Sequence, residues 1–206
     1  MGDLQFDGYI TLNGSYCFAG KEEVIYKHCI PAKDISSLIH YQKESEAFPV
    51  ILVQENGMYL NYKNDRVEEV LKLLNFSEPP VCPFDRMPVK EVFQIIAFFE
   101  EHQEERIMAL LPDCESTRWS PLFTDVVPAG SSKRVGIDHM IAYFGISLEE
   151  TLSFGDGGND IQMLKHTGLS VAMGNAEEEV KQAAKYVTSS VDEDGVFYAL
   201  KHLGVL

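Results

Sequence analysis

The chain has 206 residues, of which 45% are hydrophobic and 24% are charged, a composition typical of a folded globular protein rather than a disordered one. Its formal charge of −15 argues against nucleic acid as a partner, because binding a phosphate backbone requires clustered Lys and Arg. The sequence shows no signal peptide and no apolar run near the ~20 residues needed to span a bilayer, so we expect a cytoplasmic location and no membrane partner.

The four cysteines, Cys17, Cys29, Cys82 and Cys114, are scattered along the chain. They form no Cys-x-x-Cys pair, and no histidine lies at a zinc-ligand spacing from them. We therefore expect reduced thiols, as in a cytosolic protein, rather than a disulfide framework or a zinc site.

The first 125 residues predict a mixture of hairpins and helices. Asn56-Gly57 is a strong hairpin turn signal, and Pro31 opens a helix with apolar residues at helical spacing. In chain order we expect a strand and turn at 8–14, strands at 16–18, 24–28, 48–54, 58–63 and 92–99, a hairpin at 117–128, and helices at 33–47, 65–76 and 100–111.

From residue 126 onward the pattern changes to regular alternation of helices and strands. We expect helices at 133–144, 159–168, 176–185 and 194–204, and strands at 151–154, 169–173 and 186–190. Such alternation with short loops predicts a parallel sheet covered by helices. The fold class is therefore α/β, with a core formed by residues 1–15 and 126–206 and an inserted α/β domain at 16–125.

The most informative segment is the run from Thr151 to Met163, TLSFGDGGNDIQM. It predicts a buried strand, a Gly-rich loop with two carboxylates and an amide, and then a helix. This places Asp156, Asn159 and Asp160 at the carboxyl edge of a parallel sheet, where open α/β folds bind ligands. Carboxylate oxygens there suit Mg²⁺. The simpler interpretation is a loop with a helix N-cap, since Asn and Asp are preferred at that position.

Other motifs accompany this loop in a fixed order. They are Gly8–Gly14, Ser132-Lys133 at a helix start, the run at 171–176 and Asp194-Gly195-Val196. The ordered set closely resembles the Cof-type (subclass IIB) branch of the haloacid-dehalogenase-like phosphatases. The resemblance extends over the whole chain, is most specific in residues 126–197, and identifies the insertion as that family's α/β cap domain.

The resemblance implies a Mg²⁺-dependent phosphatase for small phosphorylated metabolites such as sugar phosphates, with a leaving-group pocket supplied by the cap. In this family an Asp nucleophile forms an aspartyl-phosphate that water hydrolyses. Lys133 matches the catalytic lysine, which neutralises nucleophile and phosphoryl oxygens. Asp156 matches the direct metal ligand. Asp160 would hold the metal through water or orient Lys133, and Asn159 would position the phosphoryl group or Lys133.

Two further asparagines are candidate substrate contacts. Asn13, followed by Gly14, matches a position near the substrate at the core–cap junction, although Asn-Gly also forms simple turns. Asn175 precedes a helix, so a capping role competes with substrate contact.

One part of the family pattern is absent from the sequence. The family begins with a strand ending in Asp-x-Asp-Gly-Thr and a second strand ending in Ser or Thr, and neither motif occurs here. In the family's sheet these two strands lie between the strands that match 8–12 and 151–154, so their loss would leave a gap of roughly 14 Å. We therefore expect a fragment of the family pattern, without the nucleophile.

The sequence leaves open whether this chain is itself an enzyme. One alternative is a non-catalytic protein that binds Mg²⁺ or a phosphometabolite. Another is a subunit whose missing strands come from a partner chain or an additional N-terminal segment, through the open edges of the sheet.

Overall fold

The computed structural model describes residues 5–20 and 23–206. The chain divides into two compact units. Unit 1 contains residues 1–26 and 132–206, and unit 2 contains residues 27–131. The helices in the described residues are all too short or too polar to cross a membrane.

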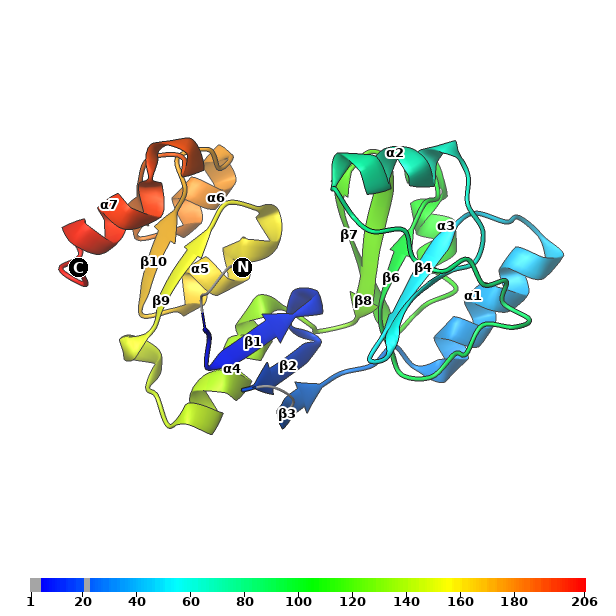
Figure 1. Ribbon diagram of the computed structural model, residues 1–206, viewed down its shortest axis with the longest axis horizontal. Helices are drawn as coiled ribbons and strands as arrows, with labels where there is room; N and C mark the ends of the chain where they lie inside the picture. Colours follow the sequence, from blue (N-terminus) through cyan, green and yellow to red (C-terminus); the bar gives the residue numbers. More distant parts are fainter. Residues whose placement is uncertain (1–4, 21–22) are drawn as a thin grey trace. The chain divides into compact units, whose positions relative to one another are not determined.

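Unit 2 is built on one antiparallel sheet with the strand order β5-β4-β6-β8-β7 (Figure 1). The strands are β4 (Val50–Gln54), β5 (Gly57–Leu60), β6 (Val92–Ala97), β7 (Cys114–Ser120) and β8 (Phe123–Pro128). As predicted, Asn56-Gly57 lies at the tight connection between β4 and β5, whose register pairs Gln54 with Gly57. The two central strands β4 and β6 contain almost only apolar residues, because side chains on both of their faces are buried.

Helices cover both faces of this sheet. On one face, α1 (Ala32–Glu44) and α3 (Glu104–Met108) bury Leu38 and Ile107 against Ile95 and Val126. On the other face lies α2 (Asp65–Leu73), whose N-cap Asn64 accepts a hydrogen bond from the backbone N–H of the third helical residue at 3.1 Å. The sheet and its helices thus form a layered domain with its own core.

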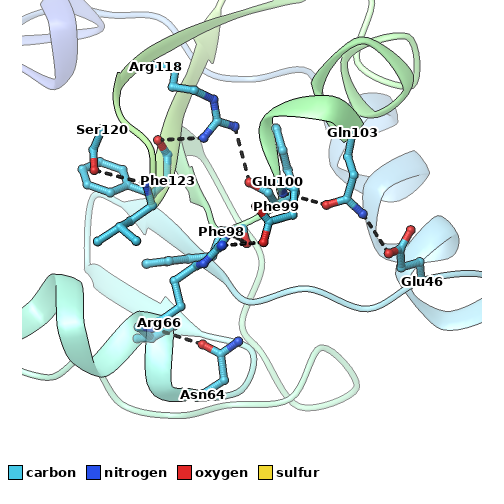
Figure 2. A network of polar contacts seen from close by, with 12 residues as sticks. Glu46, Asn64, Arg66, Phe98, Phe99, Glu100, Gln103, Arg118, Ser120 and Phe123 are labelled. Atoms are coloured by element: carbon cyan, nitrogen blue, oxygen red, sulfur yellow. Dashed lines mark hydrogen bonds and ion pairs between the residues drawn. The ribbon is translucent and has the colours of Figure 1, made fainter.

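Two arginines hold the chain where it leaves β6 (Figure 2). Arg66 of α2 donates to the carbonyl oxygen of Phe98 at 3.3 Å and pairs with Glu100. Arg118 of β7 donates to the carbonyl oxygen of Phe99 at 3.4 Å, and its side chain is only 12% exposed. Phe98 and Phe99 lie beyond the last residue of β6. The guanidinium groups therefore supply to their carbonyl oxygens the hydrogen bonds that a neighbouring strand would otherwise supply.

Unit 1 contains two separate three-stranded sheets. One has the order β1 (Gly8–Thr11), β2 (Tyr16–Ala19) and β3 (Glu23–Lys27), with β1 and β2 antiparallel. The other joins β9 (Leu152–Gly155), β10 (Leu169–Ala172) and β11 (Tyr186–Val187) in the parallel arrangement that the alternating pattern predicted. Its helices are α5 (Ile161–His166), α6 (Glu178–Ala183) and α7 (Gly195–His202). In the described residues, β1 pairs only with β2, and β9 pairs only with β10.

The helix α4 (Lys133–Phe144) connects the two sheets of unit 1, contacting β1 and β2 on one side and α5 on the other. Its contact with β1 and β2 is very close: a Cβ on Gly136 would lie 2.5 Å from Ile10 and 3.2 Å from Cys17. At the helix start, a Cβ on Gly14 would lie 2.0 Å from the carbonyl oxygen of Ser132. Only glycine at positions 14 and 136 allows the backbone of α4 to lie this close to its neighbours. These two residues therefore fix the position of α4.

The compact units divide the chain at different places from the predicted domains. The sequence placed the boundaries after residues 15 and 125, whereas contacts divide the chain after residues 26 and 131. The reason at the first boundary is that β2 pairs with β1 and β3 pairs with β2, in a sheet separate from that of the insertion. The sequence also predicts a hairpin turn at Ala19-Gly20-Lys21, of which Lys21 lies outside the described residues.

All four cysteines are free thiols, as their scattered positions predicted. Burial raises the pKa of Cys17 to about 11. Burial, together with the neighbouring Asp34 carboxylate, raises the pKa of Cys114 to about 12. Both side chains are therefore protonated and unreactive at neutral pH.

We expect Gly14→Ala to destabilise the protein strongly. The residue has a φ of +87°, and its new methyl group would overlap the Ser132 carbonyl, so the loss in free energy of unfolding should reach ~3–5 kcal/mol. Gly145→Ala is the matched control, because this glycine has a φ of +67° but nothing within 4 Å of its Cβ position, and it should cost only ~1–2 kcal/mol. Urea unfolding compares the two; equal losses would show that backbone conformation and not the contact matters.

Candidate functional site

The site is organised by the loop that follows β9. The loop folds back so tightly that a Cβ on Gly155 would lie 2.6 Å from the Cβ of Asp160. One carboxylate oxygen of Asp160, Oδ2, accepts hydrogen bonds from the backbone N–H groups of Asp156 at 3.0 Å and Gly157 at 3.1 Å. Asp160 therefore holds the loop closed from within, and its side chain is 6% exposed.

Lys133 donates a hydrogen bond to the other oxygen of this carboxylate. Its Nζ lies 2.5 Å from Asp160 Oδ1, and its side chain is one-third exposed. Lys133 is the first residue of α4, where the helix dipole disfavours a positive charge. The buried carboxylate of Asp160 offsets that unfavourable position, and it directs the ammonium group toward the loop that contains Asp156.

The three predicted asparagines join the same cluster. Asn159 Nδ2 donates to Asn13 Oδ1 at 3.0 Å, which connects residues 146 positions apart in the sequence. Asn175 Nδ2 donates to Asp156 Oδ2 at 3.1 Å, and Asn175 Oδ1 accepts from the backbone N–H of Val191 at 3.1 Å. The structure thus brings all six predicted residues together in unit 1, although their individual roles stay predictions.

A pocket of about 480 Å³ lies beside these groups within unit 1. Its polar lining comes from Lys133, Asp156 and Asp160. The remaining lining is largely apolar: Ile10, Ile137, Phe154, Gly155, Met163, Met173, Val191 and Val196. The pocket is open, and residues of both β1 (Ile10) and β9 (Phe154, Gly155) line it, so it includes space at the edges that these two strands leave unpaired in the described part of the chain, as well as beside the charged groups.

The donor set fits Mg²⁺, with one carboxylate more available than the other. Asp156 is exposed, whereas both oxygens of Asp160 already accept hydrogen bonds. In the ranges 5–20 and 23–206, no three or more His, Cys, Asp or Glu side chains gather as a closed metal cage. Mg²⁺ does not require such a cage, because it usually takes one or two protein carboxylates together with waters and substrate phosphate.

Val191 is a site residue that the sequence interpretation missed. It is 65% exposed, lines the pocket and donates its backbone N–H to Asn175. The available signal was an apolar residue directly after the polar run Thr188-Ser189-Ser190, at the end of the third parallel strand.

One Asp-x-Asp-Gly sequence does occur in the chain, at Asp192-Glu193-Asp194-Gly195. It begins in a 3-10 helix at Val191–Glu193, and Asp194 adopts a left-handed conformation with a φ of +55°. The two carboxylates that line the 480 Å³ pocket are Asp156 and Asp160, and Asp194 lines a different pocket with α7. This run therefore does not present the paired aspartates of a strand end to the site.

The sequence matches the family model of haloacid dehalogenase-like hydrolases over residues 1–200. The chain belongs to this family. It is 36% identical to YkrA of Bacillus subtilis (strain 168) over 205 residues, which cover 99% of this chain and 78% of YkrA.

Solved structures agree with this assignment. The haloacid-dehalogenase subclass IIB sugar phosphatase BT4131 matches with a TM-score of 0.86 and 44% identity, covering 97% of this chain and 76% of BT4131. The phosphatase BT1666 of Bacteroides thetaiotaomicron matches with a TM-score of 0.85 and 40% identity, covering 98% of this chain and 75% of BT1666. The α/β fold and the Cof-type resemblance drawn from the motifs are thereby confirmed.

In this haloacid-dehalogenase-like site we expect Lys133 and Asp160 to be energetically coupled. A double-mutant cycle with Lys133→Met and Asp160→Asn should give a coupling of ~1–2 kcal/mol in the free energy of unfolding, because Asp160 is nearly buried. Lys181 and Glu178 are the control pair, with side chains 25% and 80% exposed, and should give ~0.5 kcal/mol or less. Urea unfolding of all variants measures both values. Equal coupling in the two pairs would show that burial does not strengthen the Lys133–Asp160 contact.

Proposed function

We propose that the chain forms the phosphoryl-binding part of a Mg²⁺-dependent Cof-type phosphatase that acts on small phosphorylated metabolites such as sugar phosphates. The observation that carries this proposal is the Lys133–Asp160 ion pair beside the exposed carboxylate of Asp156, in a 480 Å³ pocket at the carboxyl end of β9. The family membership and the sugar-phosphatase neighbour BT4131 support it. The cytoplasmic location stays a prediction.

Each residue of the cluster has a proposed role. Lys133 attracts the phosphoryl oxygens and stabilises the charge that develops on them during transfer. Asp160 positions Lys133 and, through water, contributes to the metal site. Asp156 is the direct metal ligand, and Asn159 donates a hydrogen bond toward the phosphoryl group. Asn13 and Asn175 hold Asn159 and Asp156 in place and are substrate contacts at the edge of the pocket.

Mg²⁺, when bound, neutralises phosphoryl charge and orients the phosphate for in-line attack. The nucleophile would come from the family's Asp-x-Asp-Gly-Thr motif, which is absent from these 206 residues. The unpaired edges of β1 and β9 in the described residues support the view that an additional strand-forming segment belongs between them.

The test is to fuse an upstream segment that carries the family's Asp-x-Asp-Gly-Thr motif and to measure Mg²⁺-dependent hydrolysis of a generic phosphate ester. We expect turnover by the fusion, and a loss of at least ~10²-fold in kcat/KM on Asp156→Ala, which removes the metal ligand. Asp192→Ala is the matched control, because this exposed aspartate lies outside the pocket lining and should leave kcat/KM unchanged.

Two results would contradict the proposal. An inert fusion that folds normally would argue against the enzyme assignment. Hydrolysis by the unfused chain that is lost with Asp192→Ala and not with Asp156→Ala would place the chemistry at the Asp192–Gly195 run.

A non-catalytic role is the second candidate. It is favoured by the fact that the polar groups of the site already bind one another, so the pocket is formed without any added segment. This chain would then bind a phosphorylated ligand with Mg²⁺ and show no turnover. Calorimetry of the unfused chain with Mg²⁺ and a sugar phosphate tests the binding role, and absence of heat would count against it.

Completion by a partner chain is a variant of the first proposal. Apolar side chains in the pocket lining support it, because Val191 and Val196 are 65% and 44% exposed. A partner strand pairing with β1 or β9 would bury such residues. Size-exclusion chromatography showing a stable monomer that binds no second chain would exclude this variant.

A further inference from the structure

A second charged contact, in addition to the Lys133–Asp160 ion pair, connects the helices α4 and α5 of unit 1. His166 Nε2 lies 2.6 Å from Asp138 Oδ1, and the two side chains are 20% and 44% exposed. Asp138 lies in the middle of α4, and His166 is the last residue of α5. Because an ionised carboxylate can only accept hydrogen bonds, Nε2 of His166 carries a proton and is the donor.

The two contacts occur at similar intervals along the two helices. Asp138 lies five residues after Lys133, and His166 lies six residues after Asp160. At the rise of an α-helix, these intervals correspond to ~7.5 Å along α4 and ~9 Å along α5. The two helices therefore lie side by side and run in the same direction, and α4 is held to α5 at two separate points.

The end of α5 is itself fixed to its surroundings directly after His166. Thr167 Oγ1 shares a hydrogen bond of 2.6 Å with the hydroxyl group of Ser153 in β9. Gly168 donates its backbone N–H to the carbonyl oxygen of Leu148 at 3.1 Å. Because these contacts hold α5 against β9, the contact with His166 determines the position of α4 and not that of α5.

The position of α4 matters for the site because Lys133 is its first residue. With the Lys133–Asp160 contact alone, the helix could pivot about this point, and the flexible lysine stem could follow Asp160 while the ammonium group changes direction. The sheet of β1 and β2 does not prevent this, because it shares no strand pairing with the sheet of β9 in the described residues. A second contact about one and a half turns along α4 prevents the pivot.

Arg134 is a further charged group close to Asp138. Its Nε lies 3.9 Å from Asp138 Oδ2, and its side chain is 53% exposed, so the pair contributes little to stability. Both of these residues belong to α4, so their contact cannot hold the helix against α5. The partner of Asp138 that connects the two helices is therefore His166.

We propose that Asp138 and His166 are positioning residues for Lys133. Their hydrogen bond holds α4 against α5 and thereby keeps the Lys133 ammonium group on Asp160 and directed toward the loop that contains Asp156. Its effect on turnover rests on the proposed phosphatase function. Its effect on Lys133 itself is a property of this chain and is measured without turnover.

The first test follows the Lys133 ammonium group by nuclear magnetic resonance in the 206-residue chain with isotopically labelled lysine side chains. The Lys133 signal is identified by its disappearance in Lys133→Arg. We expect His166→Phe to shift it toward the signals of solvent-exposed lysines, because the contact with Asp160 loosens. His166→Gln should restore the parent position, because a glutamine Nε2 can donate to Asp138 in the same way. A role of the ring in packing alone would not be rescued by glutamine.

Asp138→Ala removes the same contact from the other side. Alanine is the best helix former and Asp138 is partly exposed, so this variant should fold even if His166→Phe does not. It should shift the Lys133 signal in the same direction as His166→Phe. The double variant should shift it no further, because both substitutions remove one interaction.

The second test measures hydrolysis of a generic phosphate ester by the fusion with the Asp-x-Asp-Gly-Thr segment. We expect His166→Phe and Asp138→Ala each to lower kcat/KM about tenfold, since a displaced Lys133 stabilises the phosphoryl group less well, and His166→Gln to recover most of the loss. His202→Phe is the matched control. This histidine lies on α7, where its ring stacks on Tyr186, and a phenyl ring can keep that stack. Neither the Lys133 signal nor kcat/KM should change.

Several results would overturn the proposal. They are a Lys133 signal that is unchanged in both His166→Phe and Asp138→Ala, an equal shift in His202→Phe, and a folded His166→Gln that behaves like His166→Phe. Unchanged kcat/KM in both variants of an active fusion would also overturn it. An inert fusion, together with a Lys133 signal that responds as expected, would support the positioning role and contradict only the phosphatase assignment.

Discussion

The contact on which unit 1 depends is the ion pair between Lys133 and Asp160. A carboxylate that is 6% exposed needs partners, because a buried charge without them is strongly unfavourable. Asp160 has three: the Lys133 ammonium group and two backbone N–H groups of its own loop. The same side chain therefore closes the loop after β9 and fixes the first residue of α4 against it.

This contact extends further through the start of α4. The helix lies against β1 and β2 at distances that only Gly14 and Gly136 allow, so its position also fixes the turn that carries Asn13. Asn13 in turn accepts a hydrogen bond from Asn159, in the loop that Asp160 closes. The result is a ring of contacts from β9 through α4 to β1 and back, across two sheets that share no strand pairing in the described residues. Phosphate recognition requires groups that are already in place, and such a ring holds them there before a ligand arrives.

The sequence was sufficient to predict this cluster because the positions of its residues follow from a local strand–loop–helix pattern and from the parallel topology of the sheet. A buried strand followed by Gly-Asp-Gly-Gly-Asn-Asp places its polar residues at one sheet edge, and parallel strands put their carboxyl ends side by side. What the sequence could not show is which donor each carboxylate oxygen binds, so the involvement of both oxygens of Asp160 emerged only from the structure. The assignment of β2 and β3 to the sheet of β1 was likewise missed, because a hairpin signal identifies a turn and not the sheet that the hairpin joins.

In the inserted domain, by contrast, the sequence pattern does not reveal which residues share a sheet face. In β6 and β8 the side chains on both faces are buried, so the alternation that normally reveals which residues share a face is lost. Gln94 and Asp125 then look like scattered polar residues within apolar runs, and only the register shows that they lie on the same face.

Burial alone does not explain Gln94, as a comparison with Asn61 makes clear. Asn61 is also buried, but it accepts from the backbone N–H groups of Val50 and Tyr62 and donates to Gln42 and to the carbonyl oxygen of Phe48, so its amide stabilises the fold. Gln94 contributes no such bond among the described residues, and an apolar side chain of similar size would fill its place at lower cost in free energy.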